Sequence, residues 1–281
     1  MNCEVIINTA QRPLFLDRCL TAFYRQTCQD FQVIVADDGS DCQTLQVIHR
    51  HHKQAPFPLR HVWQPKEGHR RAEILNKGIG MAEAPYIIFT DCDSLVPSWF
   101  VKDHLEKSRP GTLLCGGRIK LSREQTEPLT LEDIRSGSFE SLVPKSERRK
   151  LLLNHCKNLV YQLLRKKRRP HNLGLNMSLH TKDLERINGY DNQFLGWGNA
   201  DGDLRERLKQ IRVRPVSIYH RVYVLHQWHP KGKRNDANRL HASRSHSYWA
   251  EDGLAQALET YRRKDQKAYE YFTAQACRRQ V

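Results

Sequence analysis

The sequence predicts an α/β fold in which helices cover both faces of a mostly parallel sheet. Short apolar stretches of strand length alternate with helix-like stretches through the first third of the chain. Continuous apolar strands between amphipathic helices are typical of a sheet that is buried on both faces. Two of these strands end abruptly in pairs of acids, at 33–38 and 86–93. Because α/β proteins bind ligands at the carboxyl ends of their strands, both pairs are candidates for a functional site.

The spacing of apolar residues predicts each element, as with Leu16, Leu20 and Phe23, which recur at helical spacing. In chain order, the pattern predicts a strand at 5–8, a helix at 14–26, a strand at 31–36, a helix at 44–52, a strand at 59–63, a helix at 71–82 and a strand at 86–90. Further along, it predicts a helix at 204–210, a strand at 223–226 and a closing helix at 253–272. Since no repeat or low-complexity linker interrupts the chain, we expect one domain over 1–281.

Composition restricts the class of protein. The 281 residues are 39% hydrophobic, which is enough for a core and argues against wholesale disorder. Forty-six Lys and Arg against 31 Asp and Glu give a net charge of +15. This excess predicts attraction to an anionic partner, which is nucleic acid, an acidic membrane surface or a phosphorylated substrate. No nucleic-acid recognition motif is present, so we expect no nucleic-acid partner.

The cysteines and the N-terminus bear on the compartment. The eight cysteines include no C-x-x-C pair, which argues against a zinc ribbon or disulfide scaffold and favours buried thiols in a reducing compartment. The chain enters a strand directly without a secretion signal, and no apolar run approaches the length of a membrane span. These features predict a cytoplasmic protein.

A basic amphipathic helix is predicted at 146–169. Its apolar residues stand at i, i+4, i+7 and i+11, and they are Leu152, Cys156, Leu159 and Leu163. Cationic runs at 148–150 and 165–169 flank this apolar stripe. The pattern is compatible with packing on the domain and with peripheral attachment to anionic lipid, and less so with nucleic-acid contact.

Several common motifs are excluded. The Gly78-Ile79-Gly80 segment lies inside a predicted helix and does not follow a strand, so we discount a dinucleotide site. Neither a P-loop nor a G-x-S-x-G hydrolase motif occurs.

The acidic segments occur within a pattern that resembles a known family. Segments 8–13, 36–40 and 90–93 together resemble the family-two inverting glycosyltransferases of GT-A fold. The part from Asn176 through Gly189-Tyr190-Asp191 to Asp201 looks like the C-terminal region of galactosyl- and N-acetylgalactosaminyltransferases and of bacterial chondroitin-type polymerases. The resemblance covers roughly 3–230. It implies a nucleotide-sugar-binding half at 1–120, a basic helical insertion at 121–170, an acceptor and catalytic half at 171–240 and a helical tail at 241–281.

The resemblance also implies which residues bind the donor nucleotide. Asp38 would receive the uracil or ribose, with Thr9 on the neighbouring loop. Many relatives carry an Arg directly before the position of Asn76, where this chain has Leu75, so Arg71 would reach the diphosphate in its place. The full set of expected donor residues is Thr9, Gln11, Arg12, Asp38, Arg71 and Asp91.

Asp91 and Asp93 are candidate metal ligands. Residues i and i+2 of an extended segment share one face, and paired carboxylates suit Mn²⁺ or Mg²⁺ that bridges phosphate oxygens. By resemblance, Asp93 binds the metal, while Asp91 reaches both metal and ribose. A family histidine that completes the site aligns with His226, and His229 is the alternative. An imidazole ligand favours Mn²⁺ over Mg²⁺.

The acceptor side is expected in the segment that follows Gly196. By resemblance, Asp201 is the general base that activates the acceptor hydroxyl. Trp197 stacks on a sugar ring or, in the alternative, is a buried anchor, and Gly198 lies beside it. Relatives usually carry Glu where this chain has Ala200, so one acceptor carboxylate is missing, and Asp203 is a candidate for supplying part of its polarity.

The function that follows from this resemblance is a metal-dependent inverting transfer of a hexose or N-acetylhexosamine from a UDP-sugar. The expected acceptor is a hydroxyl of lipopolysaccharide core, capsule or a lipid-linked oligosaccharide at the inner face of the cytoplasmic membrane. The alternatives are a non-catalytic glycan- or nucleotide-binding derivative of the same fold and a retaining transferase.

Overall fold

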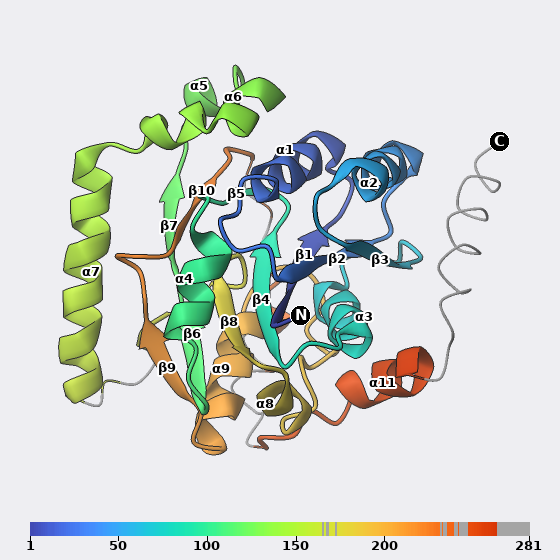
Figure 1. The fold of residues 1–281 in the computed structure, drawn as a ribbon. Coiled ribbons are helices and arrows are strands. Elements are labelled where there is room, and N and C mark those ends of the chain that lie inside the picture. The colour runs from blue at the N-terminus through green and yellow to red at the C-terminus, as the bar shows by residue number, and fades with distance from the viewer. Residues whose placement is uncertain are drawn as a thin grey trace.

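The expected α/β architecture is present in the computed structural model, which describes residues 1–164, 166, 169–171, 173–230, 232, 235–238, 241 and 247–262. A seven-stranded sheet has the strand order β3-β2-β1-β4-β8-β6-β9 (Figure 1). Its parallel half consists of β1 (Cys3–Thr9), β2 (Phe31–Asp38), β3 (Leu59–Gln64) and β4 (Tyr86–Asp91). All four strands were predicted, because each contains apolar residues that the structure buries in the sheet, in long runs for β1, β2 and β4.

The other half of the large sheet is mixed and was not predicted. β8 (Met177–His180) lies antiparallel between β4 and β6 (Thr112–Cys115), and β9 (Arg214–Ser217) pairs in parallel with β6. Each of these strands has only four residues, which is too short for a clear period in the sequence.

A second, smaller sheet positions part of the site. It contains β5 (Ser94–Leu95), β10 (Tyr223–His226) and β7 (Gly117–Lys120), with β10 in the middle. β10 is antiparallel to β5 and parallel to β7, and His226 pairs with Ser94. This register brings the end of β10 directly to the acidic segment that follows β4.

Helices cover both faces of the parallel strands (Figure 1). On one face, α1 (Pro13–Phe23) and α2 (Cys42–Gln54) contribute to the cluster that contains Val5, Val33 and Ile88. On the other, α3 (Arg71–Met81) and α11 (Leu254–Arg262) belong to the cluster that contains Ile6 and Ile34. The remaining helical elements are α4 (Phe100–Lys107), α5 (Arg123–Thr126), α6 (Leu131–Ser136), the 3-10 helix η1 (Ser138–Leu142), α7 (Lys145–Leu163), α8 (Thr181–Glu185) and α9 (Ala200–Gln210).

Close contacts fix α11 on α3, since a Cβ on Gly80 would lie 3.1 Å from the Ala257 carbonyl carbon. Of the predicted closing helix 253–272, the structure describes the part from Leu254 to Arg262, and the second half lies outside the described residues.

The helix predicted at 204–210 begins four residues earlier, at Ala200. Asn199, with φ of 70°, precedes it in the left-handed conformation, so Asp201 lies in the first helical turn.

The basic helix packs on the domain, but not through the apolar stripe that its spacing suggested. α7 lies beside β9 at the edge of the molecule (Figure 1) and contacts it through polar groups. His155 and Asn158 hydrogen bond to the Ser217 hydroxyl at 3.2 and 3.5 Å. The stripe that was a candidate for packing is exposed, namely Leu152, Cys156, Leu159 and Leu163. The helix also ends at Leu163, six residues before the expected end, and three residues of the following cationic run lie outside the described part of the chain.

Among the described residues, Cys3, Cys19, Cys92 and Cys115 are buried free thiols, as expected. Cys277 lies outside the described residues. Within the same limits, no helix is both long enough and apolar enough to cross a membrane.

Candidate active site

The candidate site forms at the carboxyl ends of β1 and β4, where α3 and α9 also begin. Asp91 is the last residue of β4, Arg71 is the first of α3 and Asp201 is the second of α9. The fold therefore brings together three charged residues that lie far apart in the sequence.

Arg71 joins two of the predicted acids. One of its terminal nitrogens lies 3.2 Å from Asp91 Oδ1, and the other lies 3.0 Å from Asp201 Oδ1. The Tyr190 hydroxyl donates a second hydrogen bond to Asp201 Oδ1, at 3.2 Å. Although burial acts to lower the pKa of Arg71, the charges of the two carboxylates raise it well above its ordinary value. Arg71 therefore remains a cation that orients both acids.

A glycine makes room for this arrangement. A Cβ on Gly174 would lie 2.3 Å from an Arg71 guanidinium nitrogen and 2.6 Å from Asp201 Oδ1. Neither distance is compatible with a side chain, so the backbone at Gly174 closely covers the Arg71–Asp201 pair. This glycine lies in the second half of the chain, and spacing along the sequence does not reveal the contact.

Asp93 forms a second cluster next to the first. Its Oδ2 lies 2.9 Å from Arg12 Nη1 and 3.1 Å from His229 Nε2, while its Oδ1 lies 3.6 Å from His226 Nε2. Burial acts to raise the pKa of Asp93, but the hydrogen bond with His229 and the charge of His226 outweigh it and lower that pKa. Burial raises the pKa of the neighbouring Asp91, and the charge of Asp93 adds to this increase.

The second cluster fits a divalent cation. One ligand atom each from Asp93, His226 and His229 lies within 4.8 Å of the others. Asp93 Oδ1 is buried and accepts no hydrogen bond from the described residues, which leaves a lone pair for a ligand. One carboxylate and two imidazoles suit Mn²⁺ better than Mg²⁺, which prefers oxygen ligands. The structure thus brings both candidate histidines to the same carboxylate.

Asp38 lies at the end of β2 and is fully buried. Its Oδ1 accepts a 2.8 Å hydrogen bond from Gln64, and its Oδ2 accepts a 3.0 Å bond from the Arg70 backbone N–H. Burial acts to raise the pKa of Asp38, but the hydrogen bonds from His69 and these two groups lower it to about 2. The carboxylate is thus ionised and held by the loop that precedes α3.

The other predicted donor residues surround the loop after β1. Thr9 is buried at the end of that strand. The side-chain amide of Gln11 donates to the Gly39 carbonyl at 3.0 Å, and the backbone N–H of Gln11 donates to the Ser40 hydroxyl at 2.8 Å. Arg12 contacts Asp93, as described above, and lies over the ring of Phe15. Gln11 therefore joins the β1 and β2 loops, and Arg12 belongs to the Asp93 cluster.

The predicted acceptor residues differ in their exposure and in their contacts. Trp197 is 57% exposed, so the alternative of a buried anchor is wrong. Gly198 has φ of 115°, and its carbonyl accepts a hydrogen bond from Asn238 at 2.9 Å. Asp203 forms a buried 2.7 Å ion pair with Arg207, so its charge is used within α9 and not at the Arg71–Asp201 pair.

Two residues near the acids were missed in the sequence. Tyr190 lies in the quoted Gly189-Tyr190-Asp191 segment, which was the available signal for it. Arg118 on β7 is half-buried, and burial lowers its pKa although the charges of Asp93 and Asp91 act to raise it. Nothing in its local sequence distinguishes Arg118 from the many other basic residues of this chain.

Comparison with protein-family models assigns this chain to a family. Residues 4–177 match the family model described as Glycosyl transferase family 2, which is more than half of the chain. The chain belongs to glycosyl transferase family 2. Residues 154–229 also match a model described as the N-terminal domain of galactosyltransferase, which includes Tyr190, Asp201 and His226. The resemblance noted in the sequence is confirmed in both parts.

Curated relatives are longer proteins. Validoxylamine A glucosyltransferase of Streptomyces hygroscopicus subsp. jinggangensis (strain 5008) is 28% identical over 224 residues, covering 73% of this chain and 50% of that one. Chondroitin synthase of Escherichia coli is 25% identical over 259 residues, covering 84% of this chain and 36% of the relative. This glycosyltransferase chain thus spans half or less of the length of these relatives.

Solved structures share the fold. S. aureus TarS 1-349 in complex with UDP superimposes with a TM-score of 0.61 at 15% identity, covering 93% of this chain and 70% of that one. The mannosyltransferase PcManGT from Pyrobaculum calidifontis, in complex with GDP-Man and Mn²⁺, gives a TM-score of 0.59 at 15% identity, covering 98% and 79%. These likenesses confirm the predicted GT-A fold.

The burial of Asp38 gives a prediction for stability. Its folded-state pKa of about 2 lies below its ordinary value, so its stabilising effect is present above about pH 4 and is lost as the pH falls towards 2. We expect Asp38→Asn to lower the free energy of unfolding by about 2 kcal/mol at pH 7.

Urea denaturation at pH 7, 4 and 3 measures this effect. The difference from wild type should shrink as the pH falls, whereas Asp30→Asn, at an exposed residue, should change little at any of these values. A difference that stays the same at all three pH values would contradict the account of Asp38.

Proposed function

We propose that this chain is a metal-dependent inverting glycosyltransferase that moves a hexose or N-acetylhexosamine from a UDP-sugar to a glycan hydroxyl. The observation that carries the proposal is the side-by-side arrangement of two clusters, Asp93 with two histidines and Asp201 with Arg71. One cluster suits a metal and the diphosphate that leaves, and the other suits a base that activates the acceptor.

In the proposed reaction, Asp201 accepts the proton of the acceptor hydroxyl. The hydroxyl oxygen forms a bond to the anomeric carbon as the bond from that carbon to the UDP oxygen breaks, and UDP leaves on the opposite side. A single displacement inverts the anomeric centre, so an α-linked donor gives a β-linked product. Arg71 and the Tyr190 hydroxyl hold the Asp201 carboxylate in one orientation.

Asp93, His226 and His229 would hold Mn²⁺, or Mg²⁺ in its place. When bound, the divalent cation supplies Lewis-acid stabilisation of the departing diphosphate. Arg12 adds a positive charge at the same carboxylate, 2.9 Å away. Asp38, Thr9 and Gln11 are proposed to bind the nucleoside, together with Asp91.

The donor and acceptor rest on the relatives. Two neighbouring structures of TarS contain UDP and UDP-GlcNAc, which favours a UDP-sugar for this chain, although a third neighbour contains GDP-Man. Chondroitin and hyaluronan synthases are among the curated relatives, and so is a teichoic acid polymerase. Their names favour a polymeric glycan acceptor, and we propose capsule, lipopolysaccharide or a lipid-linked oligosaccharide as the acceptor of this chain.

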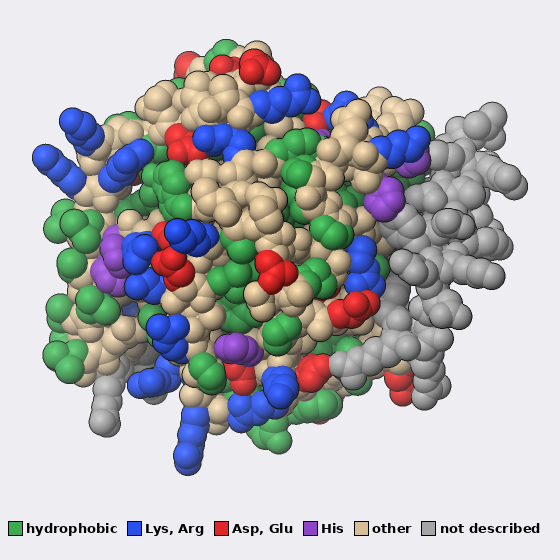
Figure 2. All heavy atoms as spheres, viewed as in Figure 1, with side chains coloured by type: hydrophobic (Ala, Val, Ile, Leu, Met, Phe, Trp, Pro, Cys, Tyr) green, Lys and Arg blue, Asp and Glu red, His purple; other side chains and the backbone are tan. Residues whose placement is uncertain are grey.

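Helix α7 supports a contact with the membrane. Six large apolar residues on it are exposed, namely Leu152, Leu153, Leu159, Val160, Leu163 and Leu164. Figure 2 shows hydrophobic side chains gathered along this edge of the molecule. Exposed cations at Arg148, Arg149 and Lys150 lie on the same helix. An apolar stripe beside cations is the pattern of a helix that lies in the interface of an anionic membrane. We therefore propose a peripheral contact of α7 with the inner face of the cytoplasmic membrane.

Replacement of the proposed base tests the reaction. With Mn²⁺ and the best of UDP-glucose, UDP-galactose and their N-acetyl forms, we expect Asp201→Asn to reduce UDP release by about 10²-fold or more. UDP binding should stay near the wild-type value, because Asp201 acts on the acceptor. Asp30→Asn, at the opposite ends of the strands, is the control and should keep full activity. Near-normal turnover of Asp201→Asn would remove it as the base.

Replacement of the histidines tests the metal site. Electron paramagnetic resonance of free Mn²⁺, recorded with UDP present, should show that His226→Ala and His229→Ala each weaken binding by roughly 10-fold or more. His49→Ala, on the exposed side of α2, should leave it unchanged. If only one of the two site variants weakens binding, the other histidine is not a ligand.

Flotation with liposomes tests the membrane contact. We expect wild-type protein to float with vesicles that contain phosphatidylglycerol and much less with pure phosphatidylcholine. Leu159→Gln with Leu163→Gln should reduce flotation at least 10-fold, because a buried leucine contributes about 1.5–3 kcal/mol. Leu14→Gln, which also replaces an exposed leucine, is the control. Equal flotation of all variants would exclude α7 as the membrane contact.

A further inference from the structure

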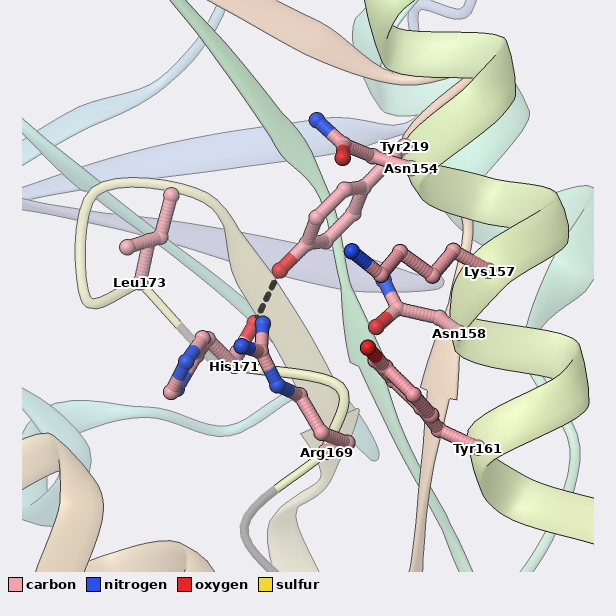
Figure 3. A pocket seen from close by; sticks show the side chains of 8 residues that line it. All are labelled: Asn154, Lys157, Asn158, Tyr161, Arg169, His171, Leu173 and Tyr219. Atoms are coloured by element: carbon pink, nitrogen blue, oxygen red, sulfur yellow. Dashed lines mark hydrogen bonds between the residues drawn. The ribbon is translucent and has the colours of Figure 1, made fainter. Parts of the chain in front are cut away.

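A cavity of about 310 Å³ lies between α7 and the segment that precedes β8. Figure 3 shows side chains of α7 on one side of it, His171 and Leu173 on the other, and Tyr219 between them. The Tyr219 hydroxyl donates to the His171 carbonyl at 2.5 Å, which holds Tyr219 against the segment that precedes β8. None of the established or proposed steps above uses this cavity.

The lining of the cavity is basic. Lys157, Arg169 and His171 contribute to it, and no carboxylate is among the eight described residues that line it. Lys157 Nζ and the Arg169 guanidinium both lie over the ring of Tyr161, at 5.6 and 5.5 Å from its centroid. Two cations are therefore held around one ring, and their mutual repulsion would be relieved by an anion between them.

More positive charge lies behind the cavity wall. Burial raises the pKa of the Tyr219 phenol, whereas the charges of Arg169, Arg205 and Arg118 act to lower it. Arg118 in turn interacts with Asp93 and Asp91 of the candidate active site. Tyr219 therefore lies within electrostatic range of both the cavity cations and a residue that borders the acids.

The lining of the cavity and the segment that covers the proposed base are adjacent in the sequence. Leu173 lines it, and the next residue, Gly174, is the one whose backbone covers Asp201. Two tyrosines and the amides of Asn154 and Asn158 add stacking surfaces and hydrogen-bonding groups of the kind that bind sugars. Leu173 and Gly174 thus connect the lining of the cavity with the residue that is proposed to act on the acceptor.

We infer that the cavity is an acceptor subsite for a sugar that carries an anionic group, either a carboxylate or a phosphate. Lys157 and Arg169 bind the anion, while Tyr161 and Tyr219 contact the ring. This inference rests on the proposed glycosyltransferase function and adds the chemical class of its acceptor. It also assigns a ligand to part of the net positive charge of +15, beyond the cations that would bind the donor diphosphate.

Binding of defined oligosaccharides tests the subsite. The probes are a hyaluronan tetrasaccharide for the carboxylate, a tetrasaccharide that ends in mannose 6-phosphate for the phosphate, and chitotetraose as the neutral reference. Isothermal titration compares wild type, Lys157→Gln with Arg169→Gln, and Arg149→Gln with Lys150→Gln. The last variant removes the same charge from exposed positions of α7 outside the cavity. Binding of UDP with Mn²⁺ is measured for each protein.

We expect at least one anionic probe to bind wild type more tightly than chitotetraose, with an affinity that falls as salt is added. The cavity variant should lose at least 10-fold in Kd, and the surface variant should not. The anionic probe that binds identifies carboxylate or phosphate.

Three results would overturn the inference. They are equal affinity for the cavity variant and wild type, equal affinity for the neutral probe, and no anionic probe bound by a wild-type protein that still binds UDP. In each of these cases the proposed function stands. If the wild-type protein does not bind UDP with Mn²⁺, the proposed function itself is contradicted, and the subsite inference with it.

Discussion

The ion pairs of Arg71 are the interaction on which the rest of the site depends. Asp91 ends a strand of the parallel half of the sheet, and Asp201 begins a helix in the later half of the chain. Arg71 contacts both, at 3.2 and 3.0 Å. Without a cation between them, two carboxylates that are removed from bulk water would repel each other and lose their solvation. The Arg71 guanidinium thus connects residues from the two parts of the chain that match the family models.

The same electrostatic constraint explains the neighbouring groups. A third acid, Asp93, lies next to Asp91, and it is balanced by Arg12 and by two histidines. Its Oδ1 nevertheless lacks a hydrogen bond from the described residues. A divalent cation would use that oxygen and would lessen the repulsion between the acids. In the proposed reaction, the Asp201 cluster would act on the acceptor and the neighbouring Asp93 cluster would hold the metal.

The sequence predicted the parallel strands and the acidic segments, because buried strands leave long apolar runs and the acids follow them directly. It failed where burial does not follow hydrophobicity. In α7, the apolar residues Leu159 and Leu163 are exposed, while Asn158 is buried against Ser217. The short antiparallel strand β8 left no period to detect. Spacing also could not choose between His226 and His229, since only the folded structure shows that both lie beside Asp93.

The central claim is that the Asp93 cluster holds a metal that binds the donor diphosphate. Isothermal titration of UDP into the protein tests this claim directly. One buffer contains Mn²⁺ and the other contains EDTA, and neither contains a further metal or chelator. The account predicts that UDP binds with Mn²⁺ present and that the affinity falls by at least 10-fold in EDTA, because the diphosphate loses its principal counter-charge. The same UDP affinity in both buffers, or no binding in either, would contradict it.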